Sequence, residues 1–182
     1  MNRFLSSVGL CILLAAPVRA EPAKDAIKKV SATFEPASAK PGETVTLKVT
    51  IELADGFHTY PVTQPAAEGK FMTNKIVFPA TGPIVFVGTV ADPAGAKSKK
   101  EEDHELLYYP GGGTWERKAV VSPLAQAGAT EAKLKIRLLV CTKDNCFPPK
   151  TIEVDASLKV LAGPAVEVEK AYRDEVEKAI RK

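Results

Sequence analysis

The chain has 182 residues, a formal net charge of +3, and 26% charged residues. This near balance of charge gives no electrostatic reason to propose nucleic acid or an anionic membrane as a partner. The length is sufficient for one domain with a real hydrophobic core.

The N-terminus predicts export. Arg3 supplies a positive charge, and residues 4–17 are mostly apolar and uncharged. Val18 and Ala20 then place compact residues at the positions that a signal peptidase reads before its cleavage site. We therefore expect a signal peptide over residues 1–20, cleaved after about Ala20, and a periplasmic mature protein of charge +1. The apolar run is short for a membrane span, so no membrane insertion is expected after cleavage.

Alternating strands dominate the rest of the chain. After a polar lead-in over residues 21–33, which could begin with a short helix or be unstructured, apolar and polar residues alternate over residues 44–53. Further short strands are expected at residues 57–60, 75–78, 84–87, 115–121, 132–141 and 151–160. Residues 92–103 are expected to form an exposed loop, and the glycines at 111–113 to interrupt regular structure.

This pattern predicts an all-β fold, an immunoglobulin-like antiparallel β-sandwich over residues 34–162. Residues 163–182 are expected to add a short amphipathic C-terminal helix. Its apolar positions are Val168, Ala171, Tyr172, Val176, Ala179 and Ile180.

Two cysteines remain once the leader, with Cys11, is removed. Cys141 and Cys146 flank four polar residues between two strand-like runs, which predicts a β-hairpin with the cysteines facing each other at its mouth. Two cysteines in an oxidising compartment are expected to pair. A ring of six residues would stabilise the fold by only roughly 2 kcal/mol. Reversible exchange, an inert hairpin staple and a metal site all remain open at this point.

A metal site has little support in the sequence. Structural zinc needs four ligands at recurring spacings, whereas the mature chain offers two cysteines with His58 and His104. Copper(I) is less excluded because it accepts soft ligands, but no positive feature indicates it. We expect no metal and no organic cofactor.

The cysteine motif resembles a known family. Cys-x4-Cys followed by an aromatic residue and two prolines, at Cys141, Cys146, Phe147, Pro148 and Pro149, is similar to the N-terminal periplasmic domain of the thiol:disulfide interchange protein DsbD. The resemblance spans residues 34–160. It implies an immunoglobulin-like fold with a redox-active cysteine pair, in which Cys146 forms mixed disulfides and Cys141 resolves them.

Two weaker matches concern the surroundings of the cysteines. Residues 55–60 are similar to the family's Asp-Gly-aromatic stretch, with Tyr60 at one of its tyrosines and His58 replacing the other. Tyr108 and Tyr109 take the place of an aromatic pair that caps the disulfide, although the family's acidic residues before that pair are Leu106 and Leu107 here. The resemblance therefore implies site-lining or capping roles for Tyr108, Tyr109, His58, Tyr60, Phe147 and Pro148. Ordinary packing is the alternative for the tyrosines, and Trp115 is expected in the core.

The function implied by the resemblance is a relay of reducing equivalents through Cys141 and Cys146. A thioredoxin-like or transmembrane thiol reductase, supplied in trans because the chain ends at Lys182, would reduce the pair, which would then reduce oxidised periplasmic proteins. Such a component would be a protein-disulfide reductase. The alternative is a non-catalytic immunoglobulin-like binding or assembly module with a structural disulfide. Donor, acceptor, direction of electron flow and oligomeric state are open.

Overall fold

The computed structural model describes residues 25–101 and 103–181. The predicted signal peptide and Cys11 lie outside the described residues. The strands are β1 (Ile27–Glu35), β2 (Ser38–Ala39), β3 (Thr44–Leu53), β4 (His58–Thr59), β5 (Lys75–Val77), β6 (Ile84–Ala91), β7 (Lys97–Glu101), β8 (His104–Pro110), β9 (Gly112–Val121), β10 (Gly128–Leu138), β11 (Val140–Cys141) and β12 (Lys150–Val160). The helices are η1 (Ala67–Phe71), η2 (Lys170–Tyr172) and α1 (Arg173–Ile180).

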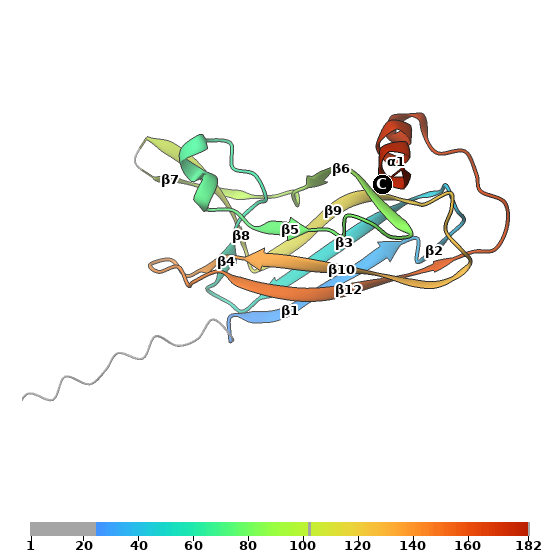
Figure 1. Ribbon diagram of the computed structural model, residues 1–182. Helices are drawn as coiled ribbons and strands as arrows, with labels where there is room; N and C mark the ends of the chain where they lie inside the picture. The colour runs from blue at the N-terminus through green and yellow to red at the C-terminus, as the bar shows by residue number, and fades with distance from the viewer. Residues whose placement is uncertain (1–24, 102, 182) are drawn as a thin grey trace, which may run out of the picture.

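The strands form two packed layers and a smaller sheet at one end (Figure 1). One layer has the strand order β1-β3-β9-β6 and the other β2-β12-β10-β5. The third sheet, which we call the small sheet, has the order β11-β4-β8-β7. Pairing is antiparallel apart from the short contact between β2 and β12. The predicted immunoglobulin-like β-sandwich is confirmed.

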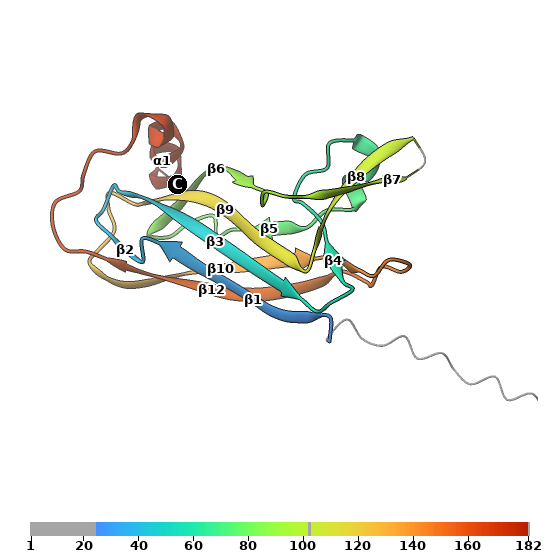
Figure 2. The same cartoon turned by 180° about the vertical axis from the view of Figure 1, so that it is seen from behind.

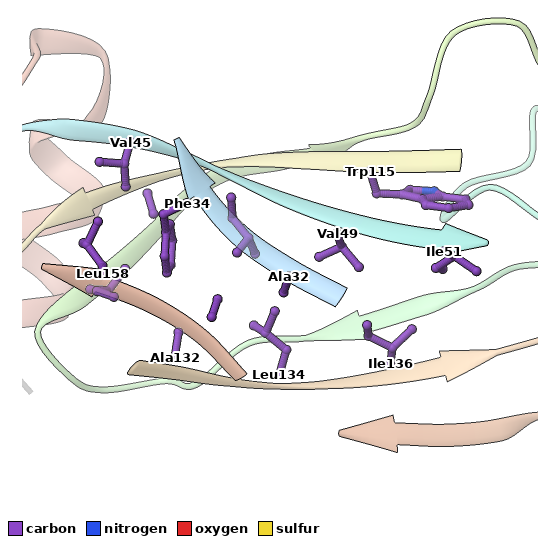
Figure 3. Close-up of a cluster of buried hydrophobic side chains, with 14 of the residues drawn as sticks. Ala32, Phe34, Val45, Val49, Ile51, Trp115, Ala132, Leu134, Ile136 and Leu158 are labelled. Atoms are coloured by element: carbon purple, nitrogen blue, oxygen red, sulfur yellow. The ribbon is translucent and has the colours of Figure 1, made fainter. Parts of the chain in front are cut away.

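The core lies between the two layers, where side chains from β3 and β9 meet those from β10 and β12 (Figure 3). In β3, alternate residues from Val45 to Leu53 are buried, as the sequence pattern predicts for a half-buried strand. Trp115 of β9 is 1% exposed, so its predicted place in the core is confirmed.

Three segments differ from the expectations. Residues 27–30 belong to β1 rather than to a helical or unstructured lead-in, because Ile27, Val30, Ala32 and Phe34 pack on the core while β1 pairs with β3. Residues 97–101 form β7 rather than an exposed loop, since they pair with β8.

The glycines at 112 and 113 also continue a strand rather than break one. Gly112 pairs with Glu52 at φ +99°, and a Cβ atom there would collide with the carbonyl oxygen of Ile51. Glycine is required at position 112 for two reasons: its positive φ is unfavourable for residues with a side chain, and β3 lies too close to leave room for a Cβ atom.

The predicted C-terminal helix is present, but α1 covers only Arg173–Ile180 of the expected residues 163–182. α1 lies against β6, with Val176 and Val168 buried against Val87 and Val120. Figures 1 and 2 place α1 and the β10–β12 loop at opposite ends of the sandwich. Over the described residues, none of the helices combines the length and apolar character needed to span a membrane.

Candidate functional site

The two cysteines lie in the loop between β10 and β12, at the end of the sandwich that carries the small sheet. A disulfide joins Cys141 to Cys146, with their Cα atoms 4.0 Å apart. The Thr142 N–H donates to the Asn145 carbonyl at 2.7 Å, and the Phe147 N–H donates to the Val140 carbonyl at 3.0 Å. Lys143 and Asp144 therefore form the tip of a tight turn closed by the disulfide.

As predicted, Cys141 and Cys146 face each other across an antiparallel bridge, but their turn is separated from the β10–β12 ladder. The β10–β12 pairing ends at Leu138 and Lys150, and Thr151 pairs with Arg137 rather than approaching the cysteines. Cys141 instead belongs to β11, which pairs with β4. The interruption falls at Leu139, whose N–H donates to the buried Asn74 side chain at 3.0 Å. A buried backbone donor needs such a partner once it leaves the strand ladder.

The two sulfur-bearing residues differ sharply in exposure. Cys141 is 1% exposed and forms a small apolar cluster with Tyr60 and Leu139. Cys146 is exposed. An attacking thiolate must reach the sulfur in line with the disulfide bond, so access governs which sulfur is attacked. Cys146 is therefore the accessible end of the bond and Cys141 the shielded end.

Tyr60 and His58 lie beside the disulfide, at the places where the sequence motif puts them. The Tyr60 hydroxyl donates to Cys141 Sγ at 3.4 Å and is 3.9 Å from Cys146 Sγ. His58 Nε2 is 3.2 Å from the same hydroxyl. Because β4 pairs with β11, His58 is also the direct cross-strand partner of Cys141.

The two tyrosines of the predicted cap point to different places. Tyr108 packs against the cluster of Tyr60, Leu139 and Cys141, and its ring lies 5.0 Å from that of His58. Tyr109 is buried in the main core, with its ring 5.5 Å from that of Trp115 and its hydroxyl donating to the Pro93 carbonyl at 2.9 Å. Neighbouring residues of a strand face opposite sides. The structure therefore brings Tyr108, and not Tyr109, to the disulfide.

Phe147 and Pro148 follow the exposed sulfur. The Phe147 ring lies 6.0 Å from that of Phe57, which attaches the chain after Cys146 to the segment before β4. Pro148 is exposed. Phe57 falls inside the matched stretch at residues 55–60, but its partnership with Phe147 depends on the folding of two distant segments.

Three supporting residues escape sequence reasoning. Asn74 is 3% exposed, accepts from the Leu139 N–H and donates to the Tyr60 carbonyl at 2.6 Å. Gln64 holds the Leu107 backbone through both ends of its amide. Met72 packs against the cluster that contains Cys141. A lone amide or methionine in an irregular stretch carries no sequence signal, because its role depends on partners distant in the chain.

Burial shapes the titration of the two groups next to the sulfurs. It raises the pKa of Tyr60 to about 12, with a smaller contribution from the charge of Glu101. Burial also lowers the pKa of His58 below its usual 6.5, and the positive charge of Lys99 lowers it further. Near neutral pH, Tyr60 therefore carries its proton and His58 is mainly neutral.

An open pocket of about 550 Å³ adjoins the site on the side of His58. Its lining includes Phe57, His58, Tyr108, Lys99, Lys143 and Asp55. The pocket gives His58 a route to solvent from within the small sheet. Among the described residues, no group of three or more His, Cys, Asp or Glu side chains is arranged to hold a metal ion.

The layers and the small sheet define an immunoglobulin-like protein with a half-shielded disulfide beside an aromatic cluster. The chain belongs to the family described as "Thiol:disulfide interchange protein DsbD, N-terminal", whose sequence model matches residues 23–158. A search of curated proteins gives no match.

The fold is also found in a solved structure. The N-terminal periplasmic domain of ScsB from Proteus mirabilis matches with a TM-score of 0.52 at 15% identity, over 88% of this chain and 56% of that chain. This chain thus spans little more than half the length of the ScsB domain. The reduced N-terminal domain of DsbD from Neisseria meningitidis matches with a TM-score of 0.38 at 19% identity, over 79% and 90% of the two chains.

Proposed function

We propose that this protein is a periplasmic thiol:disulfide interchange protein that relays reducing equivalents through Cys141 and Cys146. The observation that carries the proposal is the asymmetry of the disulfide, in which Cys146 is exposed and Cys141 is 1% exposed. An exchange reaction needs one attackable sulfur and a leaving sulfur held beside it. Membership of the DsbD N-terminal family supports the same chemistry.

Reduction begins at the exposed sulfur. A donor thiolate attacks Cys146 Sγ, the disulfide bond breaks, and Cys141 leaves as a thiolate that takes up a proton. A second thiol of the donor attacks the mixed disulfide and releases Cys146, so the donor becomes a disulfide and the pair a dithiol. In the next half-cycle the Cys146 thiolate attacks an oxidised substrate, and Cys141 attacks Cys146 Sγ to release the substrate dithiol.

The surrounding aromatic residues control access to this bond. Tyr108 packs against the cluster around Cys141, Tyr60 and His58 lie beside the disulfide, and Phe147 and Pro148 follow Cys146 in the chain. The immediate donor in this proposal is a thioredoxin-like or membrane thiol reductase, and the acceptors are oxidised periplasmic proteins.

The deciding experiment is the equilibrium of the Cys141–Cys146 disulfide against a graded glutathione or dithiothreitol redox buffer, measured by thiol alkylation. We expect a midpoint within the range of known thiol–disulfide exchange proteins, about −120 to −270 mV. A midpoint well below about −300 mV, typical of structural disulfides, would contradict the relay. It would favour an immunoglobulin-like binding module whose disulfide only fixes a turn.

Single cysteine variants test the order of attack. Cys141→Ser leaves the exposed thiol free and should accumulate a stable mixed disulfide with an oxidised partner, because no resolving sulfur remains. Cys146→Ser should form little mixed disulfide, since its remaining thiol is buried. Gel mobility with and without reductant measures both species, and equal trapping by the two variants would contradict the assignment.

A further inference from the structure

His58 is a buried titratable group that the exchange cycle above leaves without a chemical task. It is 9% exposed, and its Nε2 atom is 3.2 Å from the Tyr60 hydroxyl, which in turn is 3.4 Å from Cys141 Sγ. These distances form a continuous hydrogen-bonded chain from the imidazole to the shielded sulfur. Over the described residues, the hydrogen bonds to either sulfur come from Tyr60.

The shielded sulfur of Cys141 lacks the direct access to water that would let it gain or lose a proton, whereas the exposed sulfur of Cys146 has it. Cys146 can exchange its proton directly with water, whereas Cys141 sits in an apolar cluster with Leu139 and Tyr60. Whenever Cys141 attacks or leaves, a thiolate forms there, and a buried charge without a compensating partner is costly. The Tyr60 hydroxyl supplies a hydrogen-bond donor, but it needs a second group to accept or return a proton.

We propose that His58 and Tyr60 form a proton relay for Cys141. When Cys141 attacks the mixed disulfide at Cys146, its thiol proton passes to the Tyr60 oxygen while the Tyr60 hydroxyl proton passes to His58 Nε2. The electron pair on Cys141 Sγ forms the bond to Cys146 Sγ, and the substrate sulfur leaves as a thiolate that takes a proton from water. His58 then returns its extra proton to solvent through the adjoining pocket.

The same relay works in reverse during reduction. The leaving Cys141 thiolate receives the Tyr60 proton as Tyr60 receives one from the imidazolium of His58. Sulfur oxidation states change only through the donor and substrate disulfides already in the cycle, so the relay moves one proton and no electrons. His58 acts on the sulfur only through Tyr60.

The charged groups around His58 favour its neutral, proton-accepting form. Lys99 on β7 and Lys143 at the tip of the disulfide turn line the same pocket as His58, and both carry positive charge. Asp55, from the turn before β4, also lines the pocket, but its side chain is fully exposed and lies 3.7 Å from Lys28 Nζ. Glu101 on β7 acts on Tyr60. The lowered pKa of His58 agrees with this arrangement.

The inference rests on the proposed interchange function and is tested by the pH dependence of one step. The step is the attack of Cys141 on a glutathione mixed disulfide at Cys146, followed by release of glutathione from the purified protein. The variants are His58→Gln, Tyr60→Phe and their double mutant. Gln can still hydrogen-bond to Tyr60 but cannot titrate. His104→Gln and Tyr172→Phe are matched controls, because His104 lies at the turn end of the β7–β8 pairing and Tyr172 packs in the cluster of Val87, Val120 and Val176.

Near neutral pH, His58→Gln should slow the step by about 10²-fold, the lower end of the usual effect of a general base. The deficit should shrink at pH values high enough to ionise the Cys141 thiol, because a thiolate needs no proton acceptor. Tyr60→Phe should be at least as slow, and adding His58→Gln to it should cause no further loss. The control variants should follow the wild-type profile.

A deficit in His58→Gln that is the same at every pH would overturn the relay, as would additive losses in the double mutant. If the wild-type disulfide does not exchange with glutathione at all, the interchange function itself fails. Fluorescence of Trp115 checks that each variant is folded. A second measurement needs no substitution: the NMR titration of the His58 imidazole should differ between the oxidised and reduced proteins, and identical titrations would also contradict the relay.

Discussion

At the scale of single residues, the site depends on a few buried polar groups that hold irregular backbone in place. Asn74 joins three segments, because its amide bonds to the Leu139 N–H and the Tyr60 carbonyl and lies within 2.8 Å of the Thr59 hydroxyl. Thr59 donates in turn to the Leu139 carbonyl at 2.7 Å. These bonds fix the position of Tyr60 relative to the sulfurs, so the site geometry depends on a residue that touches neither cysteine.

Replacing Asn74 by Ala should lower the free energy of unfolding by about 2 to 4 kcal/mol. The substitution leaves two buried backbone groups without partners, and each costs about 1 to 3 kcal/mol. Urea unfolding of the oxidised protein measures the change, and Gln126→Ala, at an exposed loop position, should change it by less than about 0.5 kcal/mol. An Asn74→Ala protein as stable as the control would show that water replaces the lost bonds.

At the scale of elements, neighbouring residues of a strand point to opposite faces, so that one contacts the disulfide site and the next packs elsewhere. In β8, Tyr108 faces the disulfide cluster while Tyr109 faces the main core. In β4 and the residue after it, His58 and Tyr60 lie on the side of the disulfide, while Thr59 between them bonds to Asn74. In the C-terminal helix α1 the same division occurs between two faces: Val176 is buried against Val87 of β6, and the opposite face is exposed.

The packing of α1 predicts a difference between two of its apolar residues. Val176 is 2% exposed against Val87 and Val120, whereas Ile180 is 38% exposed. Val176→Ala should therefore lower the free energy of unfolding by about 2 kcal/mol, from lost burial and the cavity left behind. Ile180→Ala removes more atoms but should cost less than about 0.5 kcal/mol. Thermal unfolding compares them, and equal losses would mean that α1 does not dock as described.

At the scale of the whole molecule, the sandwich separates the disulfide from the C-terminal helix, which lie at opposite ends (Figures 1 and 2). Exposed ion pairs on the sheet surfaces, such as Glu35 with Lys48 and Glu153 with Lys135, lower the pKa of both carboxyls. The pKa of the buried His58 is also lowered, by burial and by the positive charge of Lys99. These groups titrate in separate pH windows and therefore give the stability of the protein a stepped pH dependence.

Stability should fall first below about pH 6.5. Because the folded-state pKa of His58 lies below its ordinary 6.5, the unfolded chain binds a proton more readily in this window. The contribution is complete above pH 6.5 and lost as the pH falls through the folded-state value. A second loss should begin below the ordinary carboxyl pKa of 4.5, as Glu35 and Glu153 take up protons.

Melting temperatures across this range test the assignment. His58→Gln should remove the first decline and keep the second, whatever its absolute stability, while His104→Gln should retain both. Persistence of the first decline in His58→Gln would place its origin in another group.

The fold class, the buried positions of the regular strands and the pairing of the two cysteines could be predicted from local sequence patterns. Periodic alternation, as in β3, identifies a half-buried strand because the pattern is local. The motif around Cys141 and Cys146, together with Tyr60 and His58, identified residues that the structure brings together. Local patterns failed where pairing with a distant strand decides the outcome, as for β7, the start of β1 and Gly112 in β9.

Three features could be assigned only from the folded chain: which sulfur is shielded, which tyrosine faces the disulfide, and the support that Asn74 gives to Tyr60 and Leu139. Exposure of Cys141 and Cys146 depends on the small sheet, whose strands come from three separate parts of the chain. The order of Tyr108 and Tyr109 was ambiguous because a shift of one residue in β8 exchanges the two faces. The contact between His58, Tyr60 and Cys141 joins residues more than 80 positions apart, and only folding creates such a hydrogen-bonded chain.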